Sequence, residues 1–583
     1  MIHPRHSSAI ISLTLIFLTW IYAPELLAAD NTIEPAGSLP TVYITTENNI
    51  PIDQKETYIP ATAYITTPDG SELTPLGSAE NQIKLGIRGR GNSTWTFLAE
   101  KKPYKIKFDK KQNPLNLGKN KHFALLNLPY SNRFGFIYSP LAFQIARTLE
   151  LGWVPSQTMV EVVLNGDYRG WYILSETVRI DSNRVDIEEQ SPDNTDPALL
   201  PYGWLIEIDN YRDVNQIDLG AHDGSSAAEL FTVKSPDPMN SVQQQWATDF
   251  LAEVTSTLRN SSPYERDWEK YFDLPNLARY FLLQELTNNE DSFTGSTYFY
   301  KTGAKLTMGP VWDIGDDFCW TKKRWNTFEG SRRKVWGKDL ARFPRFWKEV
   351  NKQFQTWKAS FDYNEMDAYI DLLAKNGEAA MHRSSQRFPE TAPTISLSRA
   401  VELAKALYRL NIDFIESSLD KDYKTCNLST TVICPENREA GGHVIANGIP
   451  LPDVEYFYGD EPSISIEPAE GYSIGSISYN DHDITASYAG NPFKLPAITS
   501  DSRLDVEFKK SSGINPIPED NDKAMQVDLH GNNIDIVSET EIEFYSMTGI
   551  LIKRLASGKT STTLPSGVYL IRSGSHTAKL MIN

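Results

Sequence analysis

IKLGIRGRGNSTWTFLAEKKPYKIKF occupies residues 83–108 of the chain. Apolar residues alternate with polar or small ones over 83–88 and again over 104–108, the period of a strand with one buried face. Glycines and hydroxyl-bearing residues at 89–94 join the two runs and provide the backbone freedom that a tight turn needs. The stretch therefore predicts two paired strands with a glycine-bearing turn between them.

The same turn has features of an anion-binding loop. Glycines let backbone N–H groups approach phosphate oxygens, and the lysines of the second strand neutralise phosphate charge. The sequence contains no GxxxxGK[ST] phosphate loop, and the third glycine of GxGxxG is missing after Gly89 and Gly91. A hairpin that covers an anionic ligand and an ordinary hairpin with surface lysines both remain open here.

Length and composition restrict the classes of protein that fit. A chain of 583 residues has room for three or four domains, and 40% hydrophobic with 23% charged residues is typical of globular proteins. The formal net charge of −18 argues against general binding to nucleic acids or anionic membranes.

The first residues have the pattern of a secretory signal peptide. Basic residues precede an apolar run from Ala9 to Ala23, and Leu27-Ala28-Ala29 provides small residues for cleavage. A single anchoring helix is the alternative, but the run is shorter than the roughly 20 residues that span a bilayer. We predict that residues 1–29 are removed, and that the exported protein has no integral membrane segment.

Cysteine use is sparse. Cys426 and Cys434 lie close together in the sequence and are predicted to form one disulfide in an oxidising compartment, which leaves Cys319 as a buried thiol. No HExxH motif and no metal-binding Cys/His spacing occur in the sequence.

The order of patterns along the chain predicts a mixed α+β protein. Strand patterns dominate up to about residue 209, apart from helical spacing over 136–150, and helical spacing dominates 239–289 and 345–419. A short hairpin is predicted between these two helical stretches, at 298–313. Short strands and turns return over 436–510 and again over 524–583. Residues 511–523, rich in proline, glycine, serine, asparagine and aspartate, are predicted to be a linker.

Two aspartates are expected to converge on one cleft. Asp291 follows a helical stretch and Asp313 ends the predicted hairpin, 313 − 291 = 22 residues later, so a strand, a turn and a strand return the chain beside its start. Phosphoryl transfer uses one such aspartate to orient and deprotonate a hydroxyl and another to hold Mg²⁺. Asn289 offers a further oxygen ligand. Acidic loop residues that are simply solvated are the alternative, as we expect for Asp316 and Asp317.

Asn165-Gly166 between two apolar runs predicts a β-hairpin, and Glu176 follows its second strand. A carboxylate there is placed to pair with a lysine of the glycine-bearing loop and direct it toward phosphate. A surface ion pair of little energetic consequence is the alternative.

These motifs together resemble the CotH kinase family, which is named for a spore coat protein. The resemblance rests on short stretches in a specific order over residues 38–425: RGRGNS at 88–93, KKPYKI at 101–106, LNGDYRG at 164–170, Glu176, ELTNNED at 285–291 and GPVWD at 309–313. It implies an atypical protein-kinase-like domain of two lobes that uses ATP with Mg²⁺ or Mn²⁺ to phosphorylate proteins outside the cytosol.

The resemblance also implies roles for individual residues. Lys102 is similar to the phosphate-binding lysine of the family, with Arg88 nearby, and Glu176 to its carboxylate partner. Asp291 is similar to the catalytic base and Asp313 to the metal ligand.

The sequence departs from the family in two places. The family usually reads Trp-Asp-Phe-Asp at the metal strand, whereas Asp313 is followed here by Ile314-Gly315, so Asp316 is displaced by one residue. The segment 127–136 also lacks the family's pattern of Asp and Arg. A non-catalytic member of the family therefore stays open as an alternative.

The C-terminal unit, 524–583, resembles the type A sorting domain of the type IX secretion system of Bacteroidetes. The resemblance is carried by FYSMTG at 544–549, PSGVYLI at 565–571 and KLMI at 579–582. It implies two-step export to the cell surface or medium, the secretion machinery as a partner, and removal of this unit. The unit at 436–510 is similar to small β repeats of bacterial surface proteins.

Three functions compete on the sequence. The first is a secreted or cell-surface kinase that transfers the γ-phosphoryl of ATP to Ser or Thr hydroxyls of proteins. The second is a surface binding or adhesion protein that keeps the fold without turnover. The third, a glycan-active enzyme with Asp291 and Asp313 as paired carboxylates, suits the 13 tryptophans but leaves Arg88 and Lys102 without a role.

Overall fold

The structure is a computed structural model that describes residues 33–97, 100–127, 134–221, 228–315, 318, 320–330, 334–435, 441–511, 525–530, 533–574 and 576–582. The chain forms two compact units, residues 1–432, 443–467 and 476–506 in one and residues 433–442, 468–475 and 507–583 in the other. The predicted signal peptide, nearly all of the predicted linker, Asp316, Asp317 and Cys319 lie outside the described residues.

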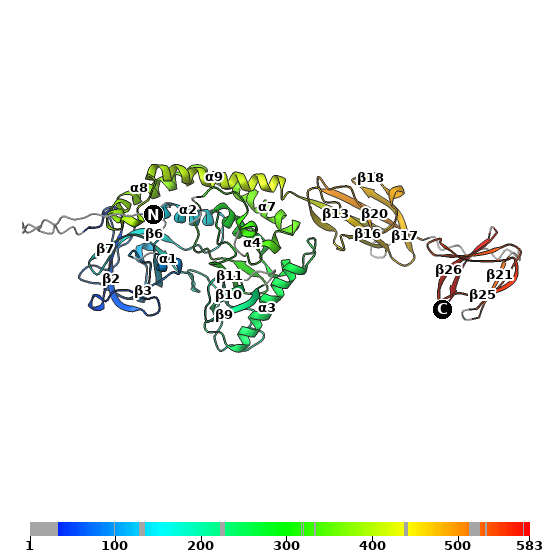
Figure 1. The fold of residues 1–583 in the computed structure, drawn as a ribbon, viewed down its shortest axis with the longest axis horizontal. Coiled ribbons are helices and arrows are strands. Elements are labelled where there is room, and N and C mark those ends of the chain that lie inside the picture. The colour runs from blue at the N-terminus through cyan, green and yellow to red at the C-terminus, as the bar shows by residue number, and fades with distance from the viewer. Residues whose placement is uncertain are drawn as a thin grey trace, which may run out of the picture. The chain divides into compact units, whose positions relative to one another are not determined.

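A closed seven-stranded barrel forms the N-terminal part of the first unit (Figure 1). Its order is β1-β2-β3-β4-β5-β7-β6, and a parallel pairing of β1 with β6 closes it. The barrel strands are β1 (Thr41–Thr46), β2 (Ile59–Thr66), β3 (Ile83–Gly89), β4 (Tyr104–Gln112), β5 (Asn120–Leu126), β6 (Gln157–Leu164) and β7 (Asp167–Glu176).

The predicted hairpin is present as β3 and β4, which pair antiparallel with Arg88 opposite Lys105. Their alternating apolar residues are buried together with those of the other barrel strands, so the polar residues between them lie on the outer face. The connection is longer than a tight turn and includes the short helix α1 (Ser93–Phe97).

The predicted Asn-Gly hairpin joins β6 to β7. Asn165 and Gly166 both have positive φ, 54° and 79°, as a two-residue hairpin turn requires. The predicted helix before this hairpin is α2 (Gly135–Thr148), whose side chains are almost all buried.

A five-stranded sheet of order β12-β11-β8-β10-β9 follows the barrel, and α3 lies beside it (Figure 1). Its strands are β8 (Trp204–Asp209), β9 (Gln216–Ala221), β10 (Ala228–Ser235), β11 (Thr297–Lys301) and β12 (Leu306–Met308). The strand predicted to reach Asp313 ends at Met308, because Gly309 has φ 114° and Pro310 has no N–H for a ladder.

Helices cover the rest of the first unit, and side-chain caps define several of their starts. Asn240 and Gln243 form a capping box at the start of α3 (Ser241–Asn260), and Asp273 caps α4 (Leu274–Leu286). The remaining helices are α5 (Asn326–Glu329), α6 (Gly337–Leu340), α7 (Pro344–Ser360), α8 (Tyr363–Arg387) and α9 (Leu397–Lys421). None of the described helices has the length and apolar character that crossing a membrane requires.

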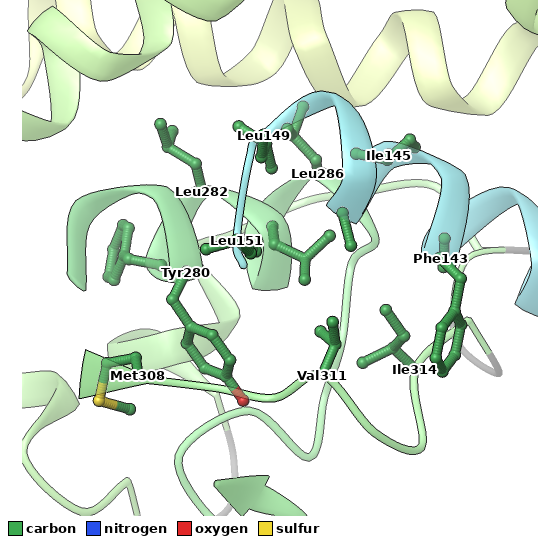
Figure 2. Close-up of a cluster of buried hydrophobic side chains, with 14 of the residues drawn as sticks. Phe143, Ile145, Leu149, Leu151, Tyr280, Leu282, Leu286, Met308, Val311 and Ile314 are labelled. Atoms are coloured by element: carbon green, nitrogen blue, oxygen red, sulfur yellow. The ribbon is translucent and has the colours of Figure 1, made fainter. Parts of the chain in front are cut away.

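One buried cluster joins α2, α4 and the segment that follows β12 (Figure 2). Figure 2 shows Phe143 of α2 beside Ile314, which neighbours Val311, and Leu149, the residue after α2, beside Leu286 of α4. All five side chains are at most 3% exposed. The shared core therefore fixes the C-terminal end of α4 relative to the segment that carries Asp313.

Among the described residues after 424, all regular structure is strand apart from one short 3-10 turn. Sheets of order β15-β13-β20-β17-β18 and β14-β16-β19 come first, then β21-β22-β25 and β24-β23-β26-β27. The first group is β13 (Thr425–Ile433), β14 (Gly442–Ala446), β15 (Asp453–Phe457), β16 (Ser463–Pro468), β17 (Tyr472–Tyr479), β18 (His482–Asp483), β19 (Phe493–Lys494) and β20 (Ser502–Lys510). The second is β21 (Met525–His530), β22 (Asn533–Ser538), β23 (Ile542–Ser546), β24 (Leu551–Leu555), β25 (Gly558–Thr563), β26 (Gly567–Ser573) and β27 (His576–Ile582).

The predicted disulfide between Cys426 and Cys434 is wrong, since both are buried free thiols. Cys426 lies near the start of β13 and Cys434 directly after its end. Eight residues of extended strand separate their Cα atoms by about 26 Å, whereas a disulfide needs about 4.4–6.8 Å. The mixed α+β class is confirmed by the helices and sheets above.

Candidate functional site

Asp291 lies in the turn that follows α4. The helix ends at Leu286, and Asn288 takes the left-handed conformation, φ 55°, that commonly terminates helices. The Asp291 N–H donates to Asn289 Oδ1 at 3.1 Å, and the Asp291 carbonyl accepts from the N–H groups of Thr294 and Gly295. These hydrogen bonds fix the backbone of Asp291 and so the position from which its half-buried side chain extends.

Asp313 lies five residues beyond β12 in a left-handed conformation, φ 54°. A non-glycine residue with this backbone is uncommon, and such residues cluster at functional sites. Ser296 Oγ donates to Asp313 Oδ2 at 3.5 Å. Part of the Asp313 residue is exposed to solvent.

Gly315 allows the Asp313 turn to pack against the start of α2. It has φ 107°, and a Cβ there would lie 2.7 Å from Ser139 Cα and 2.8 Å from the Tyr138 carbonyl oxygen. Only glycine fits this backbone at this distance from the helix.

Gly315→Ala is expected to destabilise the protein by about 1–3 kcal/mol, the usual range for overpacking. The methyl group meets helix backbone, which cannot move aside as a side chain can. Chemical denaturation of the variant measures the loss, and Gly303→Ala is the matched control, because a Cβ at Gly303 meets only a Tyr202 ring carbon at 4.0 Å. Equal stabilities of the two variants would contradict the packing argument.

The two predicted aspartates are close enough for their charges to interact. Desolvation raises the pKa of Asp313, Arg90 lowers it, and the Asp291 carboxylate raises it further. Repulsion between two carboxylates raises the free energy of the doubly ionised site, and a bound cation removes that cost. Asp291 and Asp313 therefore lie within electrostatic range of each other, while a shared catalytic cleft stays a prediction.

Arg90 lies beside this carboxylate pair. Its Cζ is 5.8 Å from the centre of the Trp312 ring, and its backbone N–H donates to the Pro103 carbonyl at 3.2 Å. Burial lowers the pKa of Arg90, and the negative charge of Asp313 is the largest influence that raises it. Arginine presents planar donors that suit phosphate oxygens. Sequence reasoning placed Arg90 in the glycine-bearing turn but gave it no role.

Positive charge gathers around Lys105 on the outer face of the barrel. Burial lowers the pKa of Lys105 to about 8, and Arg88, Arg179, Arg90 and Lys234 lower it further. These five residues are named the cation cluster. Arg88 lies directly opposite Lys105, and like charges in that position destabilise a strand pair. Such a cluster is typical of a site that binds an anion.

Arg88 is a member of this cation cluster, and its nucleotide-binding role stays a prediction. Its guanidinium donates to the Lys55 carbonyl and lies 5.1 Å from the centre of the Tyr58 ring.

Lys102 is directed elsewhere. Its Nζ donates to the Trp95 carbonyl and lies 5.0 Å from the centre of the Trp95 ring. The residue that occupies the centre of the cation cluster is Lys105, three positions later on β4.

Glu176 does not pair with Lys102 as predicted. It is 2% exposed, accepts from Arg184 Nε at 3.1 Å and from the Ser156 N–H at 3.0 Å. Burial raises the pKa of Glu176, and these donors oppose the rise. The predicted pairing fails because β5 lies between β4 and β7, which separates the two strands by about 10 Å.

The side chain of Asn289 forms hydrogen bonds within the protein. Its Nδ2 donates to Gln284 Oε1 at 2.6 Å, and its Oδ1 accepts from the Asp291 N–H. This geometry makes Asn289 a residue that positions Asp291, whereas a role as metal ligand was predicted.

Lys234, a member of the cation cluster, forms an ion pair. Lys234 of β10 contacts Glu207 of β8 at 2.8 Å, and Glu207 also forms a hydrogen bond with Tyr298 of β11. Burial raises the pKa of Glu207. The charges of Glu207 and Tyr298 also act on Arg90. Strands were predicted around Glu207 and Tyr298, but the convergence of these residues with Lys234 depends on the order of strands in the sheet.

Glu285 ties the segment after Asp313 to α4. Its fully buried carboxylate accepts from Lys322 Nζ, from the N–H groups of Asn326 and Thr327, and from Thr327 Oγ1. Since α4 also leads to Asp291, one buried carboxylate supports both chain segments of the acidic pair.

A magnesium ion with nucleotide phosphates fits this donor set. Among the residues that the structure describes, no three His, Cys, Asp or Glu side chains are grouped to hold a metal. Mg²⁺ in nucleotide sites needs only one or two carboxylates together with phosphate oxygens and water. Asp291 and Asp313 supply such carboxylates, and Arg90 of the cation cluster interacts with Asp313.

A family model described as CotH kinase protein matches residues 87–416, which covers the barrel strands from β3 onward and the helices up to α9. The chain belongs to this family. Membership in the CotH kinase family makes it a kinase-like protein, and ATP with a divalent metal is the ligand set that such a family implies.

Other comparisons add little to the CotH assignment. A solved structure titled as the Shewanella oneidensis MR-1 toxin–antitoxin system HipA, HipB and operator DNA complex is 11% identical, covers 61% of this chain and 76% of its own, and has a TM-score of 0.22. A TM-score this low does not establish a shared fold. No curated protein matches the chain.

Proposed function

We propose that the chain is a secreted or cell-surface CotH-type kinase that transfers the γ-phosphoryl of ATP to Ser or Thr hydroxyls of proteins. The observation that supports this most is the approach of Asp291 to Asp313 beside Arg90. Family membership supplies the kinase-like class. The protein acceptor and the location outside the cytosol are parts of the proposal.

Each residue has a separate task in this proposal. Asp313 holds Mg²⁺, which neutralises phosphate charge and orients the phosphates. Arg90 and the other members of the cation cluster bind phosphate oxygens, and Asp291 orients the acceptor hydroxyl. That hydroxyl oxygen forms a bond to the γ-phosphorus, the bond to the β–γ bridging oxygen breaks, ADP leaves, and the hydroxyl proton moves to Asp291.

Lys105→Met is expected to weaken ATP binding by about 1.5–3 kcal/mol, the range for a hydrogen bond to a charged group. This equals about a 10- to 150-fold increase in Kd. Lys102→Met is the matched control, since Lys102 donates to the Trp95 carbonyl. Calorimetry with ATP and Mg²⁺ measures both. A larger loss in the Lys102 variant would restore the role that the family resemblance implied.

The same residue predicts a pH dependence. Lys105 has a pKa lowered to about 8, so the free protein loses this positive charge as the pH rises through 8. ATP affinity should therefore fall between about pH 7 and 9 in the wild type. Lys105→Arg should remove most of that fall, because arginine keeps its charge over this range.

Export is the further part of the proposal. The mature protein is expected to lack residues 1–29 and the unit from about 524 onward, because the first has a signal peptide pattern and the second resembles a sorting domain. Intact-mass measurement of protein from the medium or cell surface checks both ends. Full-length chain in the cytosol would contradict the proposal.

The alternative is a surface-binding protein that keeps the fold without catalysis. Autophosphorylation and transfer to acceptor proteins with labelled ATP, measured beside calorimetric ATP binding, separate the two. If the wild type neither binds ATP nor transfers phosphate, the kinase proposal fails and the binding alternative stands.

A further inference from the structure

The barrel carries a trough of about 790 Å³ on its surface. Residues of all strands from β1 to β5 line it, together with Glu47 and with Tyr58, which precedes β2. Five neighbouring strands span four spacings, about 19 Å, which is the length of an extended peptide of about six residues. The trough therefore has the dimensions for a short polypeptide segment.

Three lysines line this trough: Lys84, Lys107 and Lys121. Among the described residues none of the three contacts a carboxylate at ion-pair distance, although Glu47 and Asp109 also belong to the lining. Lysines of this kind elsewhere in the first unit often have a carboxylate partner, as Lys405 has in Asp371 at 2.7 Å. The positive charge of the trough is thus left for a ligand.

The trough adjoins the cation cluster through one aromatic ring. Arg88 lies 5.1 Å and Lys107 5.9 Å from the centre of the Tyr58 ring. A Cβ on Gly86 would lie 2.9 Å from Tyr58 Cβ, so the absence of a side chain at Gly86 lets Tyr58 lie close to β3 in the trough. Positive charge therefore continues from the cation cluster into the trough.

We infer that this trough binds an acidic peptide segment of the protein substrate and so places the substrate beside the cation cluster. That the bound segment belongs to a substrate rests on the proposed kinase function. The binding of an acidic peptide is argued from the trough alone. Its extended length fits a polypeptide, its unpaired lysines fit carboxylates, and its continuity with Arg88 directs the bound chain toward the phosphate site.

The test uses the full chain and a fluorescent hexaglutamate peptide, with binding followed by anisotropy at low and moderate salt. The variant Lys84→Glu/Lys107→Glu/Lys121→Glu is expected to bind the peptide about ten-fold or more weakly. The control Lys305→Glu/Lys375→Glu/Lys421→Glu changes the net charge equally on exposed lysines outside the trough, and should bind within about two-fold of wild type. Equal losses in both variants would show a general charge effect and overturn the inference. Circular dichroism confirms that each variant is folded, and the Lys→Gln triple variant repeats the test with a smaller charge change.

Two competitors complete the test. An anionic oligosaccharide that binds more tightly than hexaglutamate, with the same dependence on the three lysines, would overturn the peptide assignment. Competition by ATP with Mg²⁺ would overturn it as well, because the trough would then belong to the nucleotide site. ATP binding without peptide binding means that the inference fails alone. Peptide binding without ATP binding means that the kinase proposal fails and the trough remains an acidic-peptide site.

Discussion

Asp291→Asn should lower phosphoryl transfer by about 10²–10⁴-fold, the usual contribution of a general base, while ATP and Mg²⁺ still bind. The amide keeps the size and polarity of the carboxylate but cannot take the hydroxyl proton. The loss falls toward the lower end of this range if positioning and charge stabilisation carry most of the transfer. Labelled ATP measures turnover, and calorimetry measures binding.

A matched control for this variant is Asp371→Asn, which removes an exposed carboxylate of α8 that pairs with Lys405. It should change neither turnover nor binding. If Asp291→Asn retains wild-type turnover, Asp291 is not the base. If it loses ATP binding as well, Asp291 acts mainly as a metal ligand.

Asp313→Asn should remove the magnesium-dependent part of ATP binding, with a loss of about 10²-fold or more. Residues that merely orient metal ligands already cost about 10- to 100-fold when they are changed, so loss of a negative ligand should cost at least as much. Asparagine is the informative substitution, because it tolerates the left-handed backbone of Asp313. The variant therefore tests charge at constant backbone geometry.

The two aspartate variants should differ in kind, since one loses turnover and the other loses the metal–nucleotide complex. Titration of ATP with and without Mg²⁺ shows this difference directly. Mg²⁺-dependent binding that survives in Asp313→Asn would move the metal site to other residues. Lower pH should mimic the variant in the wild type, because the raised pKa of Asp313 means protonation begins above the pH usual for aspartate.

Local patterns predicted the elements that local physics controls. The alternation of apolar and polar residues, typical of strands with one buried face, predicted β3 and β4. Asn165-Gly166 predicted the hairpin of β6 and β7, since a two-residue turn needs positive φ at both positions. The short chain separation of Asp291 and Asp313 predicted that they approach each other, and their charges do interact, although β12 ends before Asp313.

Side-chain partners were not predictable in the same way. Glu176 pairs with Arg184, and β5 lies between β4 and β7. The order of strands in a barrel cannot be predicted from the sequence of any single strand. Lys234 reaches the cation cluster from β10, far along the chain. Lys102 and Lys105 lie three residues apart with similar neighbours, so the sequence alone did not show which of them occupies the cluster.

The pairing of β1 with β6 affects how the protein folds. Thr41 pairs with Glu161, 120 residues later. The pairing of β1 with its second neighbour, β6, therefore requires most of the barrel sequence to be present. Contacts of such sequence separation form slowly, and an unpaired strand can meanwhile pair with another chain. Proteolytic loss of β1 would leave β2 and β6 as exposed edges. A chain trimmed into β1 should therefore aggregate more readily than the intact chain.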